Sequence, residues 1–446
     1  HTRLEAGQRL CLDFRPSFPR AKHQGRISLN PETAFRRDHA KRDFPSLGYR
    51  ISMHPIKSRT KTTTSIVCAI RPKKLKRLLA IGLLLVMWTT VVGAEDEWYD
   101  LWLRYDPIPD AAVQQEWRNA ASEIVVEGST PIDNSVRDEL VLGLSGLLAN
   151  QVPVSAELTR DGAVIAGYPA SSPLIAGLDW AEELAGVGEE GFIIRSTAIE
   201  GQPVTVIAGG GARGMLYGAF RYLRHLQMNG AAGNLDIQEQ PQNKLRQLNH
   251  WDNWNPTKHG TVERGYAGGT LWKWSELPGT VDPRYRDYAR ANASIGINGS
   301  VINNVNAQVD FIKSDNLPKV AALADVFRAY GIRLYLSVPY NSPMLDGGLN
   351  TADPLDPGVQ QWWQDKVAEI YQQIPDFGGF LVKGDSEGEP GPLAYGRNHA
   401  VGANMLADTL RPHGGIVMWR TFVYGPQVKK IPGGLFPSIR SHTILL

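Results

Sequence analysis

The sequence predicts an α/β protein in which an N-terminal α/β domain is followed by an incomplete TIM (β/α)8 barrel of about five βα units. Two observations carry this prediction. From about Lys244 onward, strand-like apolar runs alternate with single helix-like segments, a pattern typical of parallel βαβ units. These units recur at roughly 35–50 residues, which suits a TIM barrel with long loops, but we find five where a closed barrel needs eight.

The composition is that of an ordinary globular protein with an unusual beginning. Of 446 residues, 42% are hydrophobic and 21% are charged, and the net charge is +2. Residues 1–77 hold 19 Lys and Arg against 5 Asp and Glu, which alone could indicate a nucleic-acid partner. Residues 1–72, however, mix Arg, Pro, Ser and Thr without a sustained period. We expect a disordered or non-native leader there, and no nucleic-acid binding.

Residues 73–94 have the pattern of a secretory signal peptide. A cationic cluster at 73–77 precedes the apolar run Leu78–Val92, and small and acidic residues follow. The run has about fifteen residues whereas a spanning helix needs about 20, so an uncleaved anchor is the alternative. We therefore expect export to the periplasm or the cell exterior, with no membrane contact after cleavage. Cys11 and Cys68 precede the cleavage, so the mature chain should have no disulfide.

The N-terminal α/β domain is expected over residues 95–240. A helix is expected at 135–149, where apolar residues recur at helical spacing, and short strands are expected at 192–197 and 203–208. A glycine-rich turn then leads into a helix through 217–226.

The partial barrel, which is the expected catalytic domain, covers residues 241–424. Its strands are expected at 248–254, 299–305, 333–338, 379–383 and 415–422. Its helices are expected at 283–293, 317–330, 358–373 and 398–410. Residues 425–446 show no convincing helix or sixth strand, and we expect an irregular tail. Because five-eighths of a barrel leaves an open apolar edge, the sequence suggests that the chain is truncated or that its reading frame shifts near Pro426.

Polar and aromatic residues gather where these strands end, and barrel enzymes place their chemistry at the carboxyl ends of their strands. The five ends carry His250–Trp254, Asn303–Asn306, Pro339–Asn341, Lys383–Glu389 and Trp419–Thr421. A sugar site needs such residues, because Trp stacks on sugar rings, amides bind hydroxyls and a carboxylic acid protonates the leaving oxygen. Period-two alternation also predicts that Lys383, Asp385 and Glu387 point to one side of an extended segment.

Five segments, in one consistent order, resemble the α-glucuronidases of glycoside hydrolase family 67. They are LNHWDN (248–253), TVERGYAG (261–268), INNVNA (302–307), FLVKGDSEGEPGP (380–392) and VMWRTFVY (417–424). The resemblance runs from about Glu97 to Tyr424, with an apparent insertion around 255–259. It implies an N-terminal α/β domain, a central TIM barrel and a helical C-terminal domain. It also implies removal of 4-O-methyl-D-glucuronic acid, α-1,2-linked to xylo-oligosaccharides, with inversion, in xylan degradation.

The resemblance further implies roles for individual residues. Glu387, in DSEGEPGP, matches the general acid, and Trp251 matches the aromatic wall of the sugar pocket. Lys383 and Arg420 match cations near the uronate carboxylate, which Arg suits through its planar fork and Lys as a point charge. The expected substrate-binding residues are together Trp251, Val305, Lys383, Asp385 and Arg420. Burial or a neighbouring carboxylate can keep the acid protonated near neutral pH.

An inverting glycosidase also needs a second carboxylate, about 6.5–9.5 Å from the acid, to activate water. The resemblance places that base in later strands, and no residue of this chain matches it, so we expect little or no hydrolysis. The resemblance implies no metal or organic cofactor, and a homodimer for members of full length. The histidines show no metal-ligand spacing and are expected to be structural or solvated; those considered are His250, His259, His399 and His413.

Alternatives remain open at this point. Gly209–Gly214 fits G-x-G-x-x-G between a strand and a helix, and Asp236 lies 22 residues later, so a nicotinamide-dependent (NAD) oxidoreductase is one alternative. Against it, a single further strand-like piece precedes the barrel. A non-catalytic fragment that binds uronic sugars is the other. Among the site residues, Glu389 is the rival acid, and the assigned cations and tryptophan could instead be ordinary rim and core residues.

Overall fold

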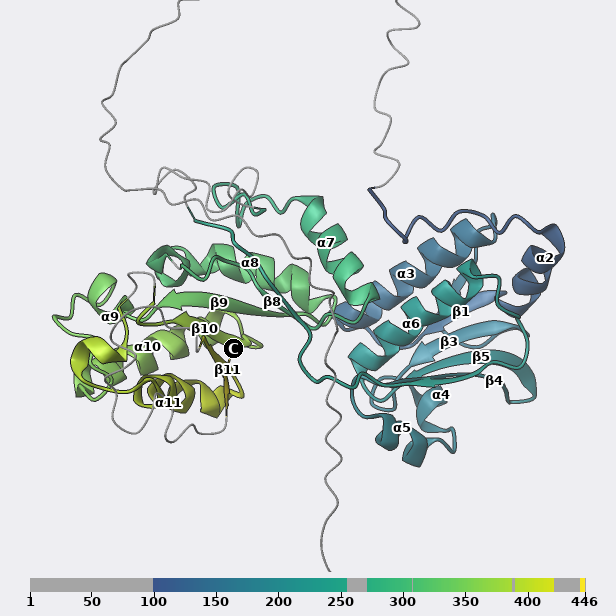
Figure 1. Ribbon diagram of the computed structural model, residues 1–446. Coiled ribbons are helices and arrows are strands. Elements are labelled where there is room, and N and C mark those ends of the chain that lie inside the picture. Colours follow the sequence, from purple (N-terminus) through teal and green to yellow (C-terminus); the bar gives the residue numbers. More distant parts are fainter. Residues whose placement is uncertain (1–98, 255–270, 307, 387–389, 421–441, 446) are drawn as a thin grey trace, which may run out of the picture. The chain divides into compact units, whose positions relative to one another are not determined.

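The computed structural model describes residues 99–254, 271–306, 308–386, 390–420 and 442–445, which all belong to one compact unit, Thr89–Leu446. The expected leader and signal peptide lie outside the described residues, so both remain predictions. Two six-stranded sheets organise the described chain (Figure 1). Among the described helices, none is long and apolar enough to cross a membrane.

The first sheet forms the N-terminal α/β region, with the strand order β2-β1-β3-β5-β4-β6. Its strands are β1 (Glu123–Val126), β2 (Val154–Ser155), β3 (Ala163–Gly167), β4 (Phe192–Ile199), β5 (Gln202–Gly209) and β6 (Asp236–Glu239). Strands β2, β1, β3 and β5 run parallel, whereas β4 is antiparallel to both β5 and β6. The expected strands at 192–197 and 203–208 correspond to β4 and β5.

Helices α3 (Pro131–Leu147) and α6 (Ala212–Gln227) pack against each other and against this sheet. Helix α3 begins at a capping box, in which the Thr130 hydroxyl accepts from the Asp133 amide and the Asp133 carboxylate accepts from the Thr130 amide. Such a cap satisfies amides of the first turn that have no partner within the helix. The shorter helices are α2 (Ala111–Ala120), α4 (Pro173–Ala176) and α5 (Ala181–Val187).

The second sheet is a partial TIM barrel of six parallel strands in the order β12-β11-β10-β9-β8-β7 (Figure 1). The strands are β7 (Gln247–Asn249), β8 (Gly299–Val301), β9 (Arg333–Pro339), β10 (Gly379–Lys383), β11 (Ile416–Trp419) and β12 (Thr443–Leu445). The helices that connect the first five are α7 (Pro283–Ser294), α8 (Leu317–Arg328), α9 (Ser342–Leu345), α10 (Pro357–Gln373) and α11 (His399–Leu410). Neighbours in the sheet are consecutive in the chain, as βαβ units require.

Two details of the expected barrel are wrong. The irregular tail contains a strand, because Thr443–Leu445 pairs in parallel with Val417–Trp419 and adds a sixth strand. Three residues are too few to show a strand pattern on their own, so the pairing with β11 is what defines this strand. The ladders of β7, β8 and β11 also end before the polar residues that follow them, so these strands are shorter than expected.

Side chains of the barrel strands alternate between two faces. Phe380 and Val382 of β10 belong to the large core that includes the helices. The intervening Leu381 belongs instead to an inner cluster, whose buried members are Val301, Val305, Tyr335, Leu381 and Met418. This inner cluster marks the inner face of the barrel and therefore shows which other residues of the strands face inward.

Candidate active site

Three of the expected site residues, Val305, Lys383 and Arg420, share the inner face at the carboxyl ends of the strands. Val305 is 5% exposed and is itself a member of the inner cluster. Trp251 lies two residues past the end of β7, and the carbonyl oxygen of its neighbour Asp252 accepts from the Asn304 amide (2.7 Å), so the loops after β7 and β8 stay in contact beyond the ladder. Lys383 and Arg420 have the parity of Leu381 and Met418. The alternation that links these residues was visible in the sequence.

Lys383 and Arg420 are direct neighbours. The register pairs Val382 with Trp419, and the Arg420 amide donates to the Val382 carbonyl oxygen (3.0 Å). The next pair along is therefore Lys383 and Arg420, with backbones about one strand spacing, ~4.8 Å, apart. Lys383 is 3% exposed, and Arg420 is half-buried. Two cations thus lie together on the inner face of the rim.

Two asparagines of the INNVNA segment form hydrogen bonds that hold this part of the rim in place. Asn303 is fully buried; its side-chain amide donates to the Ser337 carbonyl oxygen (2.9 Å) and accepts from the Ser337 amide (2.7 Å). Asn306 accepts a hydrogen bond from the Lys383 ammonium group through Oδ1. Asn303 therefore fixes the end of β8 to β9, while Asn306 orients the buried cation. Neither role was assigned from the sequence, although both residues belong to a segment that was singled out.

Asp385 does not continue the alternation of β10. Its φ is +53°, so the extended segment ends at Gly384, and the expectation that one extended segment carries Lys383 and Asp385 is wrong at Asp385. Its carboxylate Oδ2 accepts from the Leu393 amide (3.0 Å) and lies 3.1 Å from His399 Nε2. Whether Asp385 also contacts substrate remains a prediction. Glu387, the expected acid, and Glu389, its rival, lie outside the described residues.

The HWDN segment contributes buried groups behind Trp251. His250 Nε2 lies 2.5 Å from the Tyr288 hydroxyl, and burial lowers the pKa of His250 to about 4. Asp252 is 4% exposed, and burial raises the pKa of its carboxyl to about 6. Its Oδ1 accepts from the Leu271 amide (2.9 Å), while Oδ2 has no hydrogen-bond partner among the described residues. Such a carboxyl titrates near neutrality, which the sequence alone did not reveal.

Trp254 belongs to an aromatic cluster at the end of β7. Its ring stacks on Trp274 with centroids 4.9 Å apart, and both rings meet Phe311 edge-on. Its amide donates to Gln308 Oε1 (2.7 Å). Trp254 therefore packs against other aromatic side chains where the loop after β7 begins.

The glycine-rich turn at 209–214 is filled by the protein itself. A Cβ on Gly210 would collide with the Gly188 carbonyl oxygen, and the Gly210 amide donates to the Gly191 carbonyl oxygen (3.0 Å). The backbone of 188–191 therefore occupies the concavity in which a dinucleotide's pyrophosphate would lie. The sheet beyond the turn continues with antiparallel β6 rather than a second βαβ half. Both findings oppose the oxidoreductase alternative.

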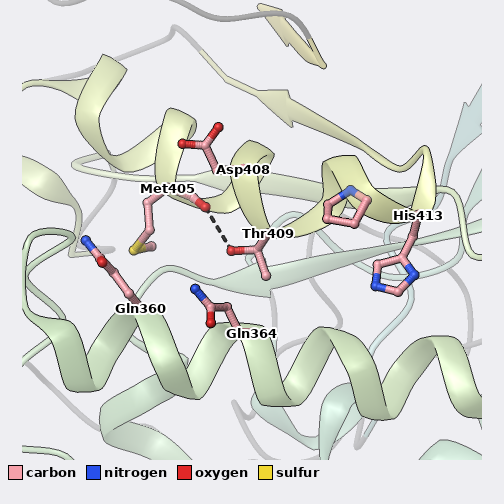
Figure 2. A pocket seen from close by; sticks show the side chains of 7 residues that line it. Gln360, Gln364, Met405, Asp408, Thr409 and His413 are labelled. Carbon is pink, nitrogen blue, oxygen red and sulfur yellow. Dashed lines mark hydrogen bonds between the residues drawn. The ribbon is translucent and has the colours of Figure 1, made fainter.

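Other cavities lie away from this rim. Figure 2 shows one of about 450 Å³ between α10 and α11, lined by residues that include Gln360, Gln364 and His413. Thr409 donates to the Met405 carbonyl oxygen there (2.9 Å). None of the expected site residues lines this cavity. Within the described part of the chain, no group of three or more His, Cys, Asp or Glu residues is arranged to hold a metal ion.

Comparison with known proteins agrees with this architecture. Residues 101–222 match the model of the glycosyl hydrolase family 67 N-terminus, and residues 225–431 match that of the family 67 middle domain. The Emericella nidulans protein "Alpha-glucuronidase A" is 39% identical over 349 residues, and the Hypocrea jecorina "Alpha-glucuronidase" is 37% identical over 354 residues. Each alignment covers 77% of this chain but 40% of the relative, so the chain spans about two-fifths of the length of these relatives. The chain therefore belongs to glycoside hydrolase family 67, a family of α-glucuronidases, and carries its N-terminal and middle domains.

Proposed function

We propose that this chain carries the uronate-binding part of an α-glucuronidase site, which acts on (4-O-methyl-)D-glucuronic acid α-1,2-linked to xylo-oligosaccharides from glucuronoxylan. The observation that carries the proposal is the pair of cations, Lys383 and Arg420, side by side on the inner face of the barrel rim. A uronate carboxylate placed against both would meet a point charge and a planar fork at once, and charge-assisted bonds of this kind are the strong ones.

The remaining roles follow from the motifs around this pair. Trp251 lies two residues past the end of β7 and offers an aromatic ring on which a sugar can stack. Glu387 follows Lys383 by four residues and would protonate the xylose oxygen as the glycosidic bond breaks, while water attacks the opposite face of the sugar. Single displacement of this kind inverts the anomeric centre. The assignment of Glu387 as the acid rests on its motif.

We further propose that this chain hydrolyses its substrate slowly or not at all. Inversion needs a base carboxylate on the far side of the sugar, and the family resemblance assigns it to strands after the fifth. Residues 425–446, which follow the fifth strand and include β12, contain neither Asp nor Glu. A site with both cations and the acid but without the base would bind uronic sugars and fail to activate water.

Two measurements on the purified chain test these proposals separately. Calorimetric titration with D-glucuronic acid and with D-glucose, which lacks the carboxylate, should show saturable binding of the acid alone. Equal binding of both sugars, or of neither, would overturn the uronate site. Incubation with aldouronic acids should release little glucuronic acid; rapid release would refute the missing base and leave the uronate site standing.

Export is a further part of the proposal, supported by the cationic, apolar and small-residue pattern of residues 73–94. Expression with residues 1–94 in place, followed by intact-mass measurement of the secreted fraction, tests it. A mature protein beginning near Glu95 is expected. Protein that stays in the cell with its leader intact would contradict export.

A further inference from the structure

Two buried side chains and one partly buried carboxylate meet behind the rim, each from a different part of the fold. Asp385 follows β10, His399 is the first residue of α11, and Trp419 is the last residue of β11. The Trp419 indole N–H donates to His399 Nδ1 (3.1 Å), and His399 Nε2 lies 3.1 Å from Asp385 Oδ2. His399 and Trp419 are both fully buried. The imidazole thus lies between the end of β11 and Asp385.

The hydrogen bond from Trp419 decides how the imidazole is oriented. Because Trp419 can only donate, Nδ1 of His399 must accept, and the ring hydrogen of a neutral imidazole then sits on Nε2. That hydrogen is directed to the side of the ring where Asp385 lies. At 3.1 Å the positive end of this N–H dipole lies against the negatively charged carboxylate, which favours the contact.

The carboxylate of Asp385 joins the two ends of the loop. Asp385 has φ +53°, an unfavourable conformation for a residue with a side chain, and it accepts from the Leu393 amide eight residues later. Gly391 lies so close that a Cβ there would collide with this carboxylate. The conformation, which Asp adopts more readily than most residues, is held by contacts from Leu393 and from α11.

We propose that His399, acting through Asp385, is a positioning residue that fixes Asp385 and Leu393, which lie on either side of Glu387 in the chain, relative to the strand end that Arg420 follows. The inference rests on the proposed function, in which Glu387 of this loop protonates the leaving oxygen while Arg420 binds the uronate carboxylate. Trp419 is adjacent to Arg420 in the chain, so the contacts from Trp419 through His399 to Asp385 connect the strand end before Arg420 with the residues that flank the proposed acid. His399 itself does not touch the sugar.

The first test needs no ligand. Hydrogen exchange of the Leu393 amide should accelerate about tenfold in His399→Phe, which corresponds to a loss of about 1.4 kcal/mol when Asp385 is no longer held by the imidazole. His399→Gln should stay near the wild-type rate, because its amide can accept from Trp419 and donate to Asp385. Asp385→Ala, at an 11% exposed side chain, should also accelerate exchange and serves if His399→Phe fails to fold. The matched control is His413→Phe, an exposed histidine stacked on Tyr371 outside this network.

The second test uses ligands. In His399→Phe, the affinity for glucuronic acid α-1,2-linked to xylobiose should fall about tenfold, while the affinity for free glucuronic acid changes less than twofold, because the lost contact is with the leaving oxygen. Restoration by His399→Gln is expected of a positioning residue and not of a residue that only fills space. Unchanged Leu393 exchange in both His399→Phe and Asp385→Ala would overturn the inference. Altered exchange without any uronate binding, even in the wild type, would overturn the proposed function instead.

Discussion

Replacing Lys383 with methionine tests the uronate site most directly. Methionine keeps the length of the side chain and removes its charge at a position that is 3% exposed. A hydrogen bond to a charged group contributes about 1.5–3 kcal/mol, so the affinity for D-glucuronic acid should fall by about 10- to 150-fold at 25 °C. Binding to the aromatic wall does not involve this charge, so stacking on Trp251 should survive. Calorimetric titration at fixed ionic strength measures the loss.

A second buried lysine of the barrel provides the control. Lys366 of α10 is 7% exposed, and its ammonium group pairs with Glu369 (2.8 Å) and Asp346 (3.3 Å). Lys366→Met should destabilise the fold, since it leaves two carboxylates without their cation, yet it should leave sugar affinity unchanged. Lys383→Met should lower the affinity for D-glucuronic acid and have the smaller effect on the stability of the fold. If both variants lost uronate affinity equally, or if Lys383→Met kept it, the reasoning from the paired cations would be refuted.

Two further predictions concern stability. Gly210→Ala should lower the free energy of unfolding by about 2–4 kcal/mol, because its Cβ would collide with the Gly188 carbonyl oxygen; an unchanged urea midpoint would contradict this packing. The pKa of Asp252 is raised to about 6, so the folded state binds the proton more tightly, and the free energy of unfolding falls as pH rises from about 4 to 6. The pKa of His250 is lowered to about 4, so the unfolded state binds the proton more tightly, and the free energy of unfolding rises with pH over the same window. In Asp252→Asn the free energy of unfolding should therefore rise with pH, by up to about 1.4 kcal/mol per pH unit. In His250→Gln it should fall with pH. Urea denaturation at pH 4.5 and 5.5 measures both slopes, and a free energy that does not change between the two pH values would contradict them.

The helices of the barrel were predictable because residues at the start of each helix determine where it begins. Asp282 and Asp356 each precede a proline and cap the helix that follows, and Asn398 caps α11. A capping side chain followed by a first-turn proline fixes where a helix begins without help from distant residues. The expected starts at 283, 358 and 398 accordingly lie within one residue of the observed ones.

Strand ends were predicted less well, since a ladder ends where its partner does. The strands expected at 248–254 and 299–305 extend past the last paired residues, Asn249 and Val301. Beyond those points the backbone still lies on the rim, but its hydrogen bonds go to side chains and loops. The sixth strand shows the converse case, because Thr443–Leu445 is a strand only by virtue of pairing with β11.

Within the site, alternation was enough to bring Lys383 and Arg420 to one face, because both continue regular strands. It failed one step later at Asp385, whose φ of +53° is imposed by Leu393 and His399, 8 and 14 residues further along. His399 shows no metal-ligand spacing, and the sequence offered no other reason to select it. Its importance comes from Trp419, twenty residues away in the chain and in hydrogen-bond contact in the fold.

The glycine-rich segments 209–214 and 384–391 show why the sequence motifs alone did not distinguish a phosphate site from a sugar site. In both, a glycine is present because another group needs the space over its Cα: the Gly188 carbonyl oxygen at Gly210, and the Asp385 carboxylate at Gly391. A phosphate loop must leave that space open for the ligand, with amides directed into it. Whether the turn is filled by the protein or open to a ligand depends on residues outside the motif. A G-x-G-x-x-G match therefore indicates a nucleotide site only where no group of the protein already fills the turn.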